Sequence, residues 1–195
     1  MITETVTGAA LAARIPALAQ LRITVFRDYP YLYDGSEAYE AEYLRTYTSA
    51  AHAMAVIARE GDTVVGASTG VPLASEDEAF RRPFAALGID PATVFYCGES
   101  VLLPPWRGRG LYRAFFDGRE AFARSLGGIR LMAFCGVVRP ESHPLRPAEW
   151  GPLDPVWRHF GYAPEPRLHT TYVWKDVDQT ESSAHTMQFW IKHLD

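Results

Sequence analysis

The residues best placed to do chemistry form an Arg-Gly-Arg-Gly turn at positions 107–110, just before a segment patterned as a helix. The first amides of an α-helix have no partner within the helix, and the helix dipole adds partial positive charge at that end. Gly108 and Gly110 let an anion approach the main chain, and Arg107 and Arg109 add formal positive charge. The turn therefore predicts a phosphate site, with solvated surface arginines as the alternative.

Two common phosphate-binding loops do not match this turn. The GxxxxGK[ST] loop needs a lysine followed by a hydroxyl residue, and neither is present here. The dinucleotide loop GxGxxG needs a third glycine, whereas 108-GRGLYR-113 ends in arginine. The predicted phosphate site is therefore of another kind.

The elements around the turn should hold it rigidly. An apolar strand is expected over 93–103, and Pro104 and Pro105 end it. A helix is expected over 110–126, with its apolar side chains on one stripe that packs on a sheet. A second buried strand is expected over 129–138.

The rest of the chain alternates between helix and strand patterns. The expected elements are a strand 2–7, a helix 8–27, a helix from the N-cap Ser36 to about Thr48, a hairpin of 54–58 and 64–71, one short helix or two fragments within 75–88 because of Pro83, a loop 139–155, a helix 156–162, and strands 168–177 and 184–194. This order predicts one α/β domain over 1–195, with a mixed sheet and helices on both faces.

Composition excludes several classes of protein. The 195 residues carry 19 basic and 23 acidic side chains, a net charge of −4, which argues against a dedicated nucleic-acid binder. Cys97 and Cys135 lack metal-site spacing, so no metal is expected, and both are expected in the core. The N-terminal segment reads as neither a signal peptide nor a membrane span, which predicts a cytoplasmic protein without membrane contacts.

The run Leu102-Leu103-Pro104, followed by Arg107-Gly108-Arg109-Gly110-Leu111-Tyr112, resembles the acetyl-coenzyme A signature of the GNAT (GCN5-related) N-acetyltransferases, usually written R/Q-x-x-G-x-G/A. The order of elements and the helix end 156-VWRHFGY-162 are also similar to that family. The resemblance implies the GNAT fold: a mixed, mostly antiparallel sheet that splays between its fourth and fifth strands, here 93–103 and 129–138.

The resemblance also implies how the cofactor acetyl-CoA binds. Main-chain groups of Leu102 and Leu103 would pair with the pantetheine arm, and amides from Gly108 to Tyr112 would hold the pyrophosphate beside Arg107 and Arg109. Two residues depart from the family pattern. Tyr112 stands where glycine or alanine is preferred, and Trp157 stands where a tyrosine often protonates the leaving thiolate. An indole does not readily give up a proton.

Amine acetylation also needs a base and an acceptor pocket. Glu99 interrupts an apolar strand, which predicts a general base of raised pKa, or otherwise a salt-bridged structural residue. Tyr29, Tyr31 and Tyr33 lie in a Pro/Gly break and are expected to line the acceptor pocket. Arg139 in the long loop could recognise an acidic acceptor or simply be solvated.

The sequence thus predicts transfer of an acetyl group from acetyl-CoA to a primary amine of a small molecule or peptide, by direct attack in a ternary complex. Alternatives are a GNAT-fold protein that binds acyl-CoA with weak or no catalysis, a transferase of a longer acyl group, and a nucleotide-binding module outside the family. Phe189 and Trp190 could belong to the core or to a homodimer surface.

Overall fold

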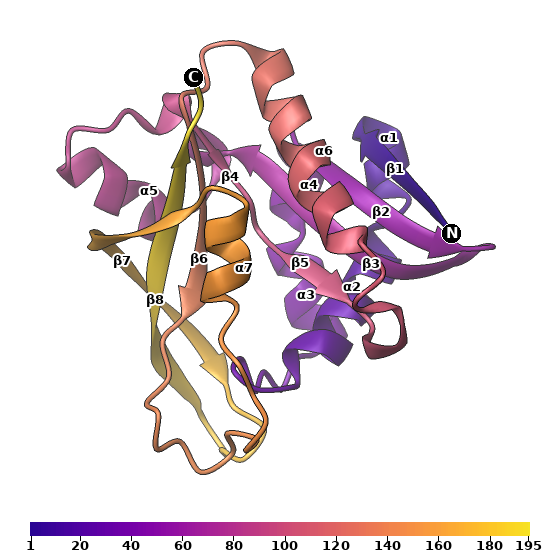
Figure 1. The fold of residues 1–195 in the computed structure, drawn as a ribbon, viewed down its shortest axis with the longest axis vertical. Coiled ribbons are helices and arrows are strands. Elements are labelled where there is room, and N and C mark those ends of the chain that lie inside the picture. Colours follow the sequence, from indigo (N-terminus) through magenta and orange to yellow (C-terminus); the bar gives the residue numbers. More distant parts are fainter.

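One eight-stranded sheet organises the chain, and a computed structural model describes all residues 1–195 (Figure 1). The strand order is β1-β2-β3-β4-β6-β8-β7, and β5 pairs with β3 off this path. Every pair is antiparallel except β4 with β6, so the predicted mixed, mostly antiparallel sheet is confirmed. The strands are β1 Ile2–Thr7, β2 Met54–Glu60, β3 Thr63–Pro72, β4 Val94–Tyr96, β5 Ser100–Leu102, β6 Leu131–Val137, β7 Ala163–Lys175 and β8 Ser182–His193.

The sheet opens at the centre of the segment that was expected to be one strand, 93–103. β4 runs parallel to β6 as far as Tyr96, and the Cys97 amide donates one more hydrogen bond to the Ala133 carbonyl at 2.7 Å. After Gly98 and Glu99 the chain resumes as β5, which pairs only with β3. The single long strand was therefore wrong, because the chain leaves β6 at this point, but the predicted splay is present between β5 and β6.

Helices cover both faces of the sheet, as predicted. Alternate residues of β2 show the two sides: Met54 and Val56 pack with α6, whereas Ala55 and Ile57 pack with α1, α2 and α4. In Figure 1, α6 and α7 lie in front of the sheet. The helices are α1 Gly8–Ala12, α2 Ile15–Phe26, α3 Glu37–Tyr43, α4 Arg45–Ser49, α5 Glu78–Ala86, α6 Leu111–Leu126 and α7 Asp154–His159.

The helix expected over 8–27 is divided into α1 and α2. Pro16 has no N–H to bond the carbonyl of Ala12, and its ring would clash with that carbonyl in a continuous helix. The next expected helix, to about Thr48, is divided into α3 and α4 at Leu44. Its predicted start is confirmed, because the Ser36 hydroxyl accepts a hydrogen bond from the Tyr39 amide at 3.3 Å.

Pro83 lies inside a single helix, α5, without dividing it. A proline at this position leaves the carbonyl of Ala79, four residues earlier, without its helical donor. The hydroxyl of Thr170 on β7 donates to that carbonyl at 2.6 Å. A side chain from the sheet thus satisfies the acceptor, and one of the two expected forms, a single short helix, is the one observed.

The last strands lie inside the protein. Phe189 is fully buried and Trp190 is 4% exposed, so both belong to the core and neither can form a dimer surface. None of the helices combines the length and the apolar composition that crossing a bilayer requires.

Candidate active site: two pockets that meet in the sheet

The Arg-Gly-Arg-Gly turn has the shape of an anion site. Gly108 and Gly110 both have positive φ, and Gly110 is the left-handed N-cap of α6 with no side chain capping the helix amides. A Cβ built on either glycine would meet nothing within 4 Å. Arg109 is exposed beside them, and Tyr112 in the first turn of α6 is half-buried against the core. The turn is therefore open, positively charged and lined by free amides.

The edge of β5 next to the splay also offers free main-chain groups. Two hydrogen bonds at the ends of this segment go to β3. The Thr69 amide donates to the Glu99 carbonyl at 3.1 Å, and the Leu103 amide donates to the Val65 carbonyl at 3.0 Å. Because strand groups alternate in direction, those of Ser100 and Leu102 face the splay. The Leu102 carbonyl accepts from Arg107 Nε at 3.1 Å. Neither main-chain group of Leu103 is free to bind a ligand, since its amide bonds to Val65 and its carbonyl accepts from the Trp106 amide.

A pocket of about 490 Å³, including its open mouth, lies between this edge, β6 and the helices α6 and α7. We call it the α6-side pocket. Trp157 lies in it and packs on Phe134 and Trp190, with ring centroids 5.0 Å apart in both cases. Its lining comprises Phe26, Tyr31, Cys97, Gly98, Glu99, Ser100, Tyr112, Phe116, Arg119, Phe134, Cys135, Leu153 and Trp157.

A second pocket, of about 550 Å³ with its mouth, lies on the opposite face of the sheet. We call it the aromatic pocket, because nine of its thirteen lining residues carry aromatic rings. Tyr31 and Tyr33, two of the predicted acceptor residues, are among them; Tyr29 instead packs on Trp150 of the long loop, 4.9 Å away. The lining comprises Arg22, Phe26, Tyr31, Tyr33, Tyr39, Tyr43, Phe80, Tyr96, Gly98, Cys135, Tyr172, Trp174 and Met187.

The two pockets meet through the opening in the sheet. Four residues line both of them: Phe26, Tyr31, Gly98 and Cys135. Gly98 must be a glycine, since a Cβ there would lie 1.8 Å from the Tyr47 hydroxyl and 2.8 Å from Oγ1 of Thr69. This junction connects the α6-side pocket on one face with the aromatic pocket on the other.

Ion pairs inside the protein hold the junction. Arg22 on α2 donates to Oε2 of Glu40 at 2.5 Å and to Oε2 of Glu99 at 2.6 Å. Burial alone would lower the pKa of Arg22, but the carboxylates of Glu99 and Glu40 keep it above its ordinary value. Burial raises the pKa of Glu99, although Arg22 and Thr69 oppose the shift. No sequence pattern singles out Arg22, which lies within the helix expected over 8–27.

The Glu99 carboxylate is therefore shielded from solvent, unlike a base that faces water. Its side chain has no exposed surface, and its other oxygen, Oε1, accepts from the Thr69 hydroxyl at 2.7 Å. Thr69 Oγ1 in turn lies next to Gly98 at the junction. The Thr69 hydroxyl therefore connects the Glu99 carboxylate to the junction through a hydrogen bond.

Arg119 of α6 contributes an unpaired positive charge to the α6-side pocket. Arg119 is only 2% exposed, and no carboxylate pairs with its guanidinium. Its Nη1 is 3.5 Å from the Glu99 carbonyl, and its guanidinium lies 4.8 Å from the Phe116 ring. A buried cation without a counter-ion is costly, so it favours a ligand that carries negative charge.

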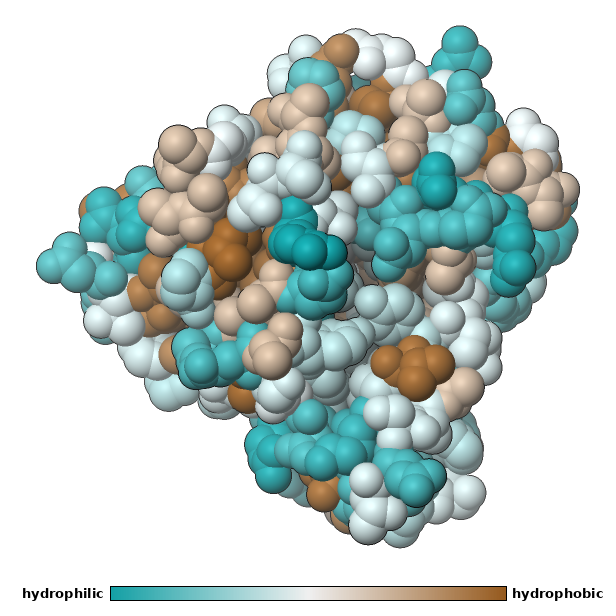
Figure 2. Space-filling model, turned by 180° about the vertical axis from the view of Figure 1, so that it is seen from behind, coloured by the Kyte–Doolittle hydropathy of each residue, from teal (hydrophilic) through white to brown (hydrophobic).

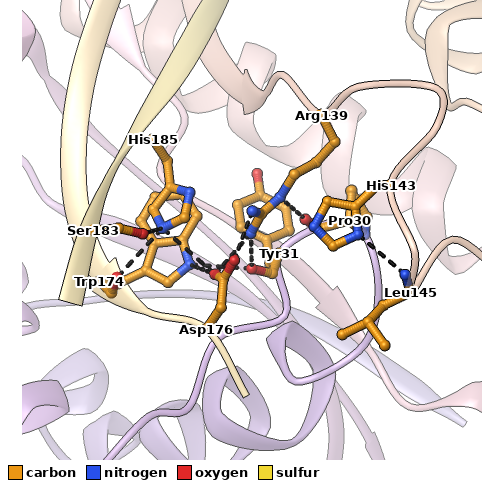
Figure 3. A network of polar contacts seen from close by, with 9 residues as sticks. All are labelled: Pro30, Tyr31, Arg139, His143, Leu145, Trp174, Asp176, Ser183 and His185. Carbon is orange, nitrogen blue, oxygen red and sulfur yellow. Dashed lines mark hydrogen bonds and ion pairs between the residues drawn. The ribbon is translucent and has the colours of Figure 1, made fainter. Parts of the chain in front are cut away.

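A polar network fixes two rings of the aromatic pocket (Figure 3). Arg139 donates to both oxygens of Asp176, at 2.7 and 2.8 Å, and to the main-chain carbonyls of Pro30 and Tyr31. The Trp174 indole N–H donates to Asp176 at 3.0 Å, and the His185 ring stacks on Trp174 at 3.8 Å. Arg139 is thus neither solvated nor free to bind an acidic acceptor; it positions Tyr31 and Trp174.

A polar opening adjoins the aromatic pocket on the face that carries α2, α3 and α5, which Figure 2 shows hollowed near its centre with hydrophilic residues around the hollow. We call it the acidic vestibule. It shares Tyr39, Tyr43 and Tyr172 with the aromatic pocket, and it also contains Glu42, Arg45, Thr46, Ser49, Glu76 and Asp77.

Glu76 is the unusual member of the vestibule. It is 8% exposed, and no side chain forms a hydrogen bond or an ion pair with it. Burial, the charge of Glu99 and the charge of Asp77 raise the pKa of Glu76 to about 7, and a hydrogen bond from the Asp77 amide only partly opposes this. No local pattern singles out Glu76, because 75-SEDE-78 reads as the polar start of a helix.

The two cysteines are core residues, as predicted. Burial raises the pKa of the Cys97 thiol, and burial also raises that of Cys135 to about 12. The Cys135 sulfur lies 3.2 Å from the Tyr96 hydroxyl oxygen. Both thiols therefore stay protonated near neutral pH, which makes either of them a poor nucleophile.

No family model and no curated protein matches the sequence. Solved structures do match over almost the whole chain. Arabidopsis thaliana NAA60 in complex with a bisubstrate analogue has a TM-score of 0.62 and 10% identity, covering 100% of this chain and 99% of that one. An aminoglycoside 6'-N-acetyltransferase complexed with coenzyme A has a TM-score of 0.60 and 12% identity, covering 99% and 97%.

A GCN5-related N-acetyltransferase from Kribbella flavida matches with a TM-score of 0.58 and 16% identity, over 98% of each chain. The fold of this chain is therefore the GNAT fold, as the sequence resemblance implied. At these identities the likeness establishes the fold alone, and the activity has to be argued from the site.

The charge of Glu76 should make stability depend on pH. The unfolded chain loses this proton near pH 4.5, whereas the folded protein keeps it until about pH 7, so stability falls as pH rises between these values. Replacing Glu76 by Gln should therefore raise the free energy of unfolding by about 2 to 3 kcal/mol at pH 8 and by less than about 1 kcal/mol at pH 5. Urea titrations at both pH values measure this.

The matched control is Glu78→Gln, two residues on, where the side chain is 71% exposed and paired with Arg81 at 3.0 Å. That variant should change stability little at either pH. A Glu76→Gln protein that is destabilised at pH 8, or stabilised equally at both values, would contradict this view of the vestibule.

Proposed function

We propose that this protein transfers an acetyl group from acetyl-CoA to a primary amine, by direct attack in a ternary complex. The observation that carries the proposal is the junction at Tyr31, Gly98 and Cys135, where pockets on opposite faces of the sheet meet. Two substrates could reach the same point from two sides. The buried, protonated cysteines argue against a covalent acyl-enzyme.

The residues of the α6 side fit coenzyme A. The amides from Gly108 to Tyr112, with Arg107 and Arg109, would hold the pyrophosphate at the N-terminus of α6. The edge of β5 at Ser100 and at the Leu102 amide would pair with the pantetheine arm, as an added strand pairs with a sheet edge. When bound, acetyl-CoA supplies an acyl group activated as a thioester.

Arg119 would supply positive charge to the transfer. It is buried in the α6-side pocket without a carboxylate partner, next to the Glu99 carbonyl. Acyl transfer places negative charge on the thioester oxygen, and a cation already fixed in a dry pocket stabilises such charge with little reorganisation.

Glu99 remains the proposed base, acting through Thr69. The acceptor nitrogen would give its proton to Oγ1 of Thr69, as the hydroxyl proton of Thr69 passes to Oε1 of Glu99 over 2.7 Å. The raised pKa of Glu99 suits it to take up this proton. Arg22 would hold the carboxylate in place throughout.

Tyr31 is the proposed acid in place of Trp157. Burial raises the pKa of Tyr31, so its hydroxyl stays protonated. It lines both pockets, whereas Tyr112 lines only the α6-side pocket. A phenol at the junction can donate its proton to a sulfur that departs on the α6 side, which an indole cannot do.

Substitution at the turn tests the cofactor site. Gly110→Val places a side chain over the free amides and should weaken acetyl-CoA binding by about tenfold or more, because anions reach this main chain only across glycine. Titration calorimetry measures the affinity. ATP should compete poorly with coenzyme A, which separates this site from a general nucleotide module.

The matched control is Gly88→Val after α5. Gly88 also has positive φ and open space around its Cβ position, so the backbone strain is similar, but it lies away from the turn. The Gly88→Val protein should bind acetyl-CoA with the affinity of the native protein. Equal weakening in both variants, or none in Gly110→Val, would contradict the placement of the cofactor.

The base pathway predicts that Thr69 and Glu99 act together. Thr69→Val and Glu99→Gln should each lower kcat by about a hundredfold and remove the acidic limb of the pH–rate profile. Thr69→Ser should restore most of the activity. Glu99→Gln also breaks a buried ion pair and can lose about 3 kcal/mol of stability. The comparison of Thr69→Val with Thr69→Ser therefore decides the test.

Thr170→Val is the matched control for Thr69→Val, since Thr170 is also buried but bonds only to the Ala79 carbonyl. It should lower stability and leave kcat and its pH profile alone. A Thr69→Val enzyme with the kinetics of the native protein would exclude this route for the proton.

The role of Tyr31 as the acid predicts that loss of its hydroxyl lowers activity more than loss of the Tyr112 hydroxyl. Tyr31→Phe keeps the ring and loses only the hydroxyl, and it should lower kcat by about ten- to a hundredfold. Tyr112→Phe should lower kcat by less than about threefold, because Tyr112 lines only the α6-side pocket and is not one of the residues shared by both pockets. Single-turnover measurements give both rates, and equal effects of the two variants would argue against Tyr31.

A further inference from the structure

The entrance to the aromatic pocket has more negative charge than positive. In the acidic vestibule, Arg45 is already paired with Glu42 on the exposed side of α3 and α4. Glu76 and Asp77 have no basic partner there. Behind them, two carboxylates, Glu40 and Glu99, share the single guanidinium of Arg22.

Glu76 indicates that a cation binds in this space. It is more than nine-tenths buried, it lines the vestibule, and no side chain hydrogen-bonds or ion-pairs with it. Apart from the hydrogen bond from the Asp77 amide the carboxylate has no partner, so its ionised form destabilises the empty protein. A ligand with a positive charge would provide the missing partner and recover that loss on binding.

The chamber beyond the vestibule suits the rest of such a ligand. Most of its walls are aromatic side chains, whose rings can attract cations as well as apolar chains. Arg22 already demonstrates this in the structure, with its guanidinium 3.9 Å from the centroid of Tyr43. Tyr39, Tyr43 and Tyr172 belong to both spaces, so one extended molecule could reach from Glu76 to the junction.

We propose that the acceptor is a small aliphatic amine with a second positive charge, a diamine or polyamine, whose distal ammonium pairs with Glu76 while its reacting nitrogen lies at the junction. This inference rests on the proposed function. An amine whose far end is neutral or acidic would leave Glu76 buried without a cationic partner, so the vestibule also selects against those acceptors.

Matched amines test the proposal with the full-length protein. Acetylation of 1,6-diaminohexane should exceed that of 1-aminohexane and 6-amino-1-hexanol by about tenfold or more in kcat/KM, and 6-aminohexanoate should be the poorest acceptor. Diaminoalkanes of shorter and longer chain should show an optimum, because the distance from Glu76 to the junction is fixed.

Glu76→Gln should remove the preference for the diamine and raise its KM, while kcat/KM for 1-aminohexane should not fall. Glu78→Gln should behave as the native protein does. A loss of kcat for both amines would instead mean that Glu76 acts on the reacting nitrogen, and this would overturn the proposal.

Binding without acetyl-CoA gives a readout that does not need turnover. Calorimetry should show 1,6-diaminohexane binding to the native protein more tightly than 1-aminohexane, and losing about tenfold in affinity in Glu76→Gln. Equal affinities for the two amines would overturn the inference even if the protein acetylates both. Absence of acetyl-CoA binding would overturn the proposed function instead, and the amine affinities would still decide the question of the second charge.

Discussion

The interaction on which the site depends is the pair of ion contacts made by Arg22. Its guanidinium joins α2 to Glu40 of α3 and to Glu99 at the break between β4 and β5. Breaking a buried pair of this kind leaves an uncompensated charge in the interior, a cost of about 3 to 5 kcal/mol. The residue after Gly98 is therefore tied to α2 and α3, which fixes the chain at the point where the sheet opens.

Several other features follow from that opening. Since β5 does not pair with β6, its Ser100 and Leu102 groups face an open edge, and the Arg-Gly-Arg-Gly turn that follows begins α6 above the same edge. The rings of the aromatic pocket close the opposite side, where Arg139 holds the segment of Pro30 and Tyr31 against Asp176. The polar groups of the site are thus fixed by contacts between elements, and the apolar ones by packing.

Local patterns in the sequence predicted the parts of the site that are built from neighbouring residues. The glycines at 108 and 110, the two prolines before them and the stripe of α6 lie within one turn and helix, and the N-cap at Ser36 is equally local. Arg22 and Glu99 are 77 residues apart, and Arg139 and Asp176 are 37 apart, so no periodicity could reveal either pair. Glu76 was hidden for the same reason: its burial comes from α3, α4 and β7.

The two pockets open on opposite faces of one sheet, and this arrangement has a consequence for the order of events. A molecule arriving along α6 and one arriving between α3 and β7 would not block each other's path, and the same holds for the two products as they depart. The shape of the protein would therefore impose no sequence of arrival, so saturation with either reactant should not obstruct the other.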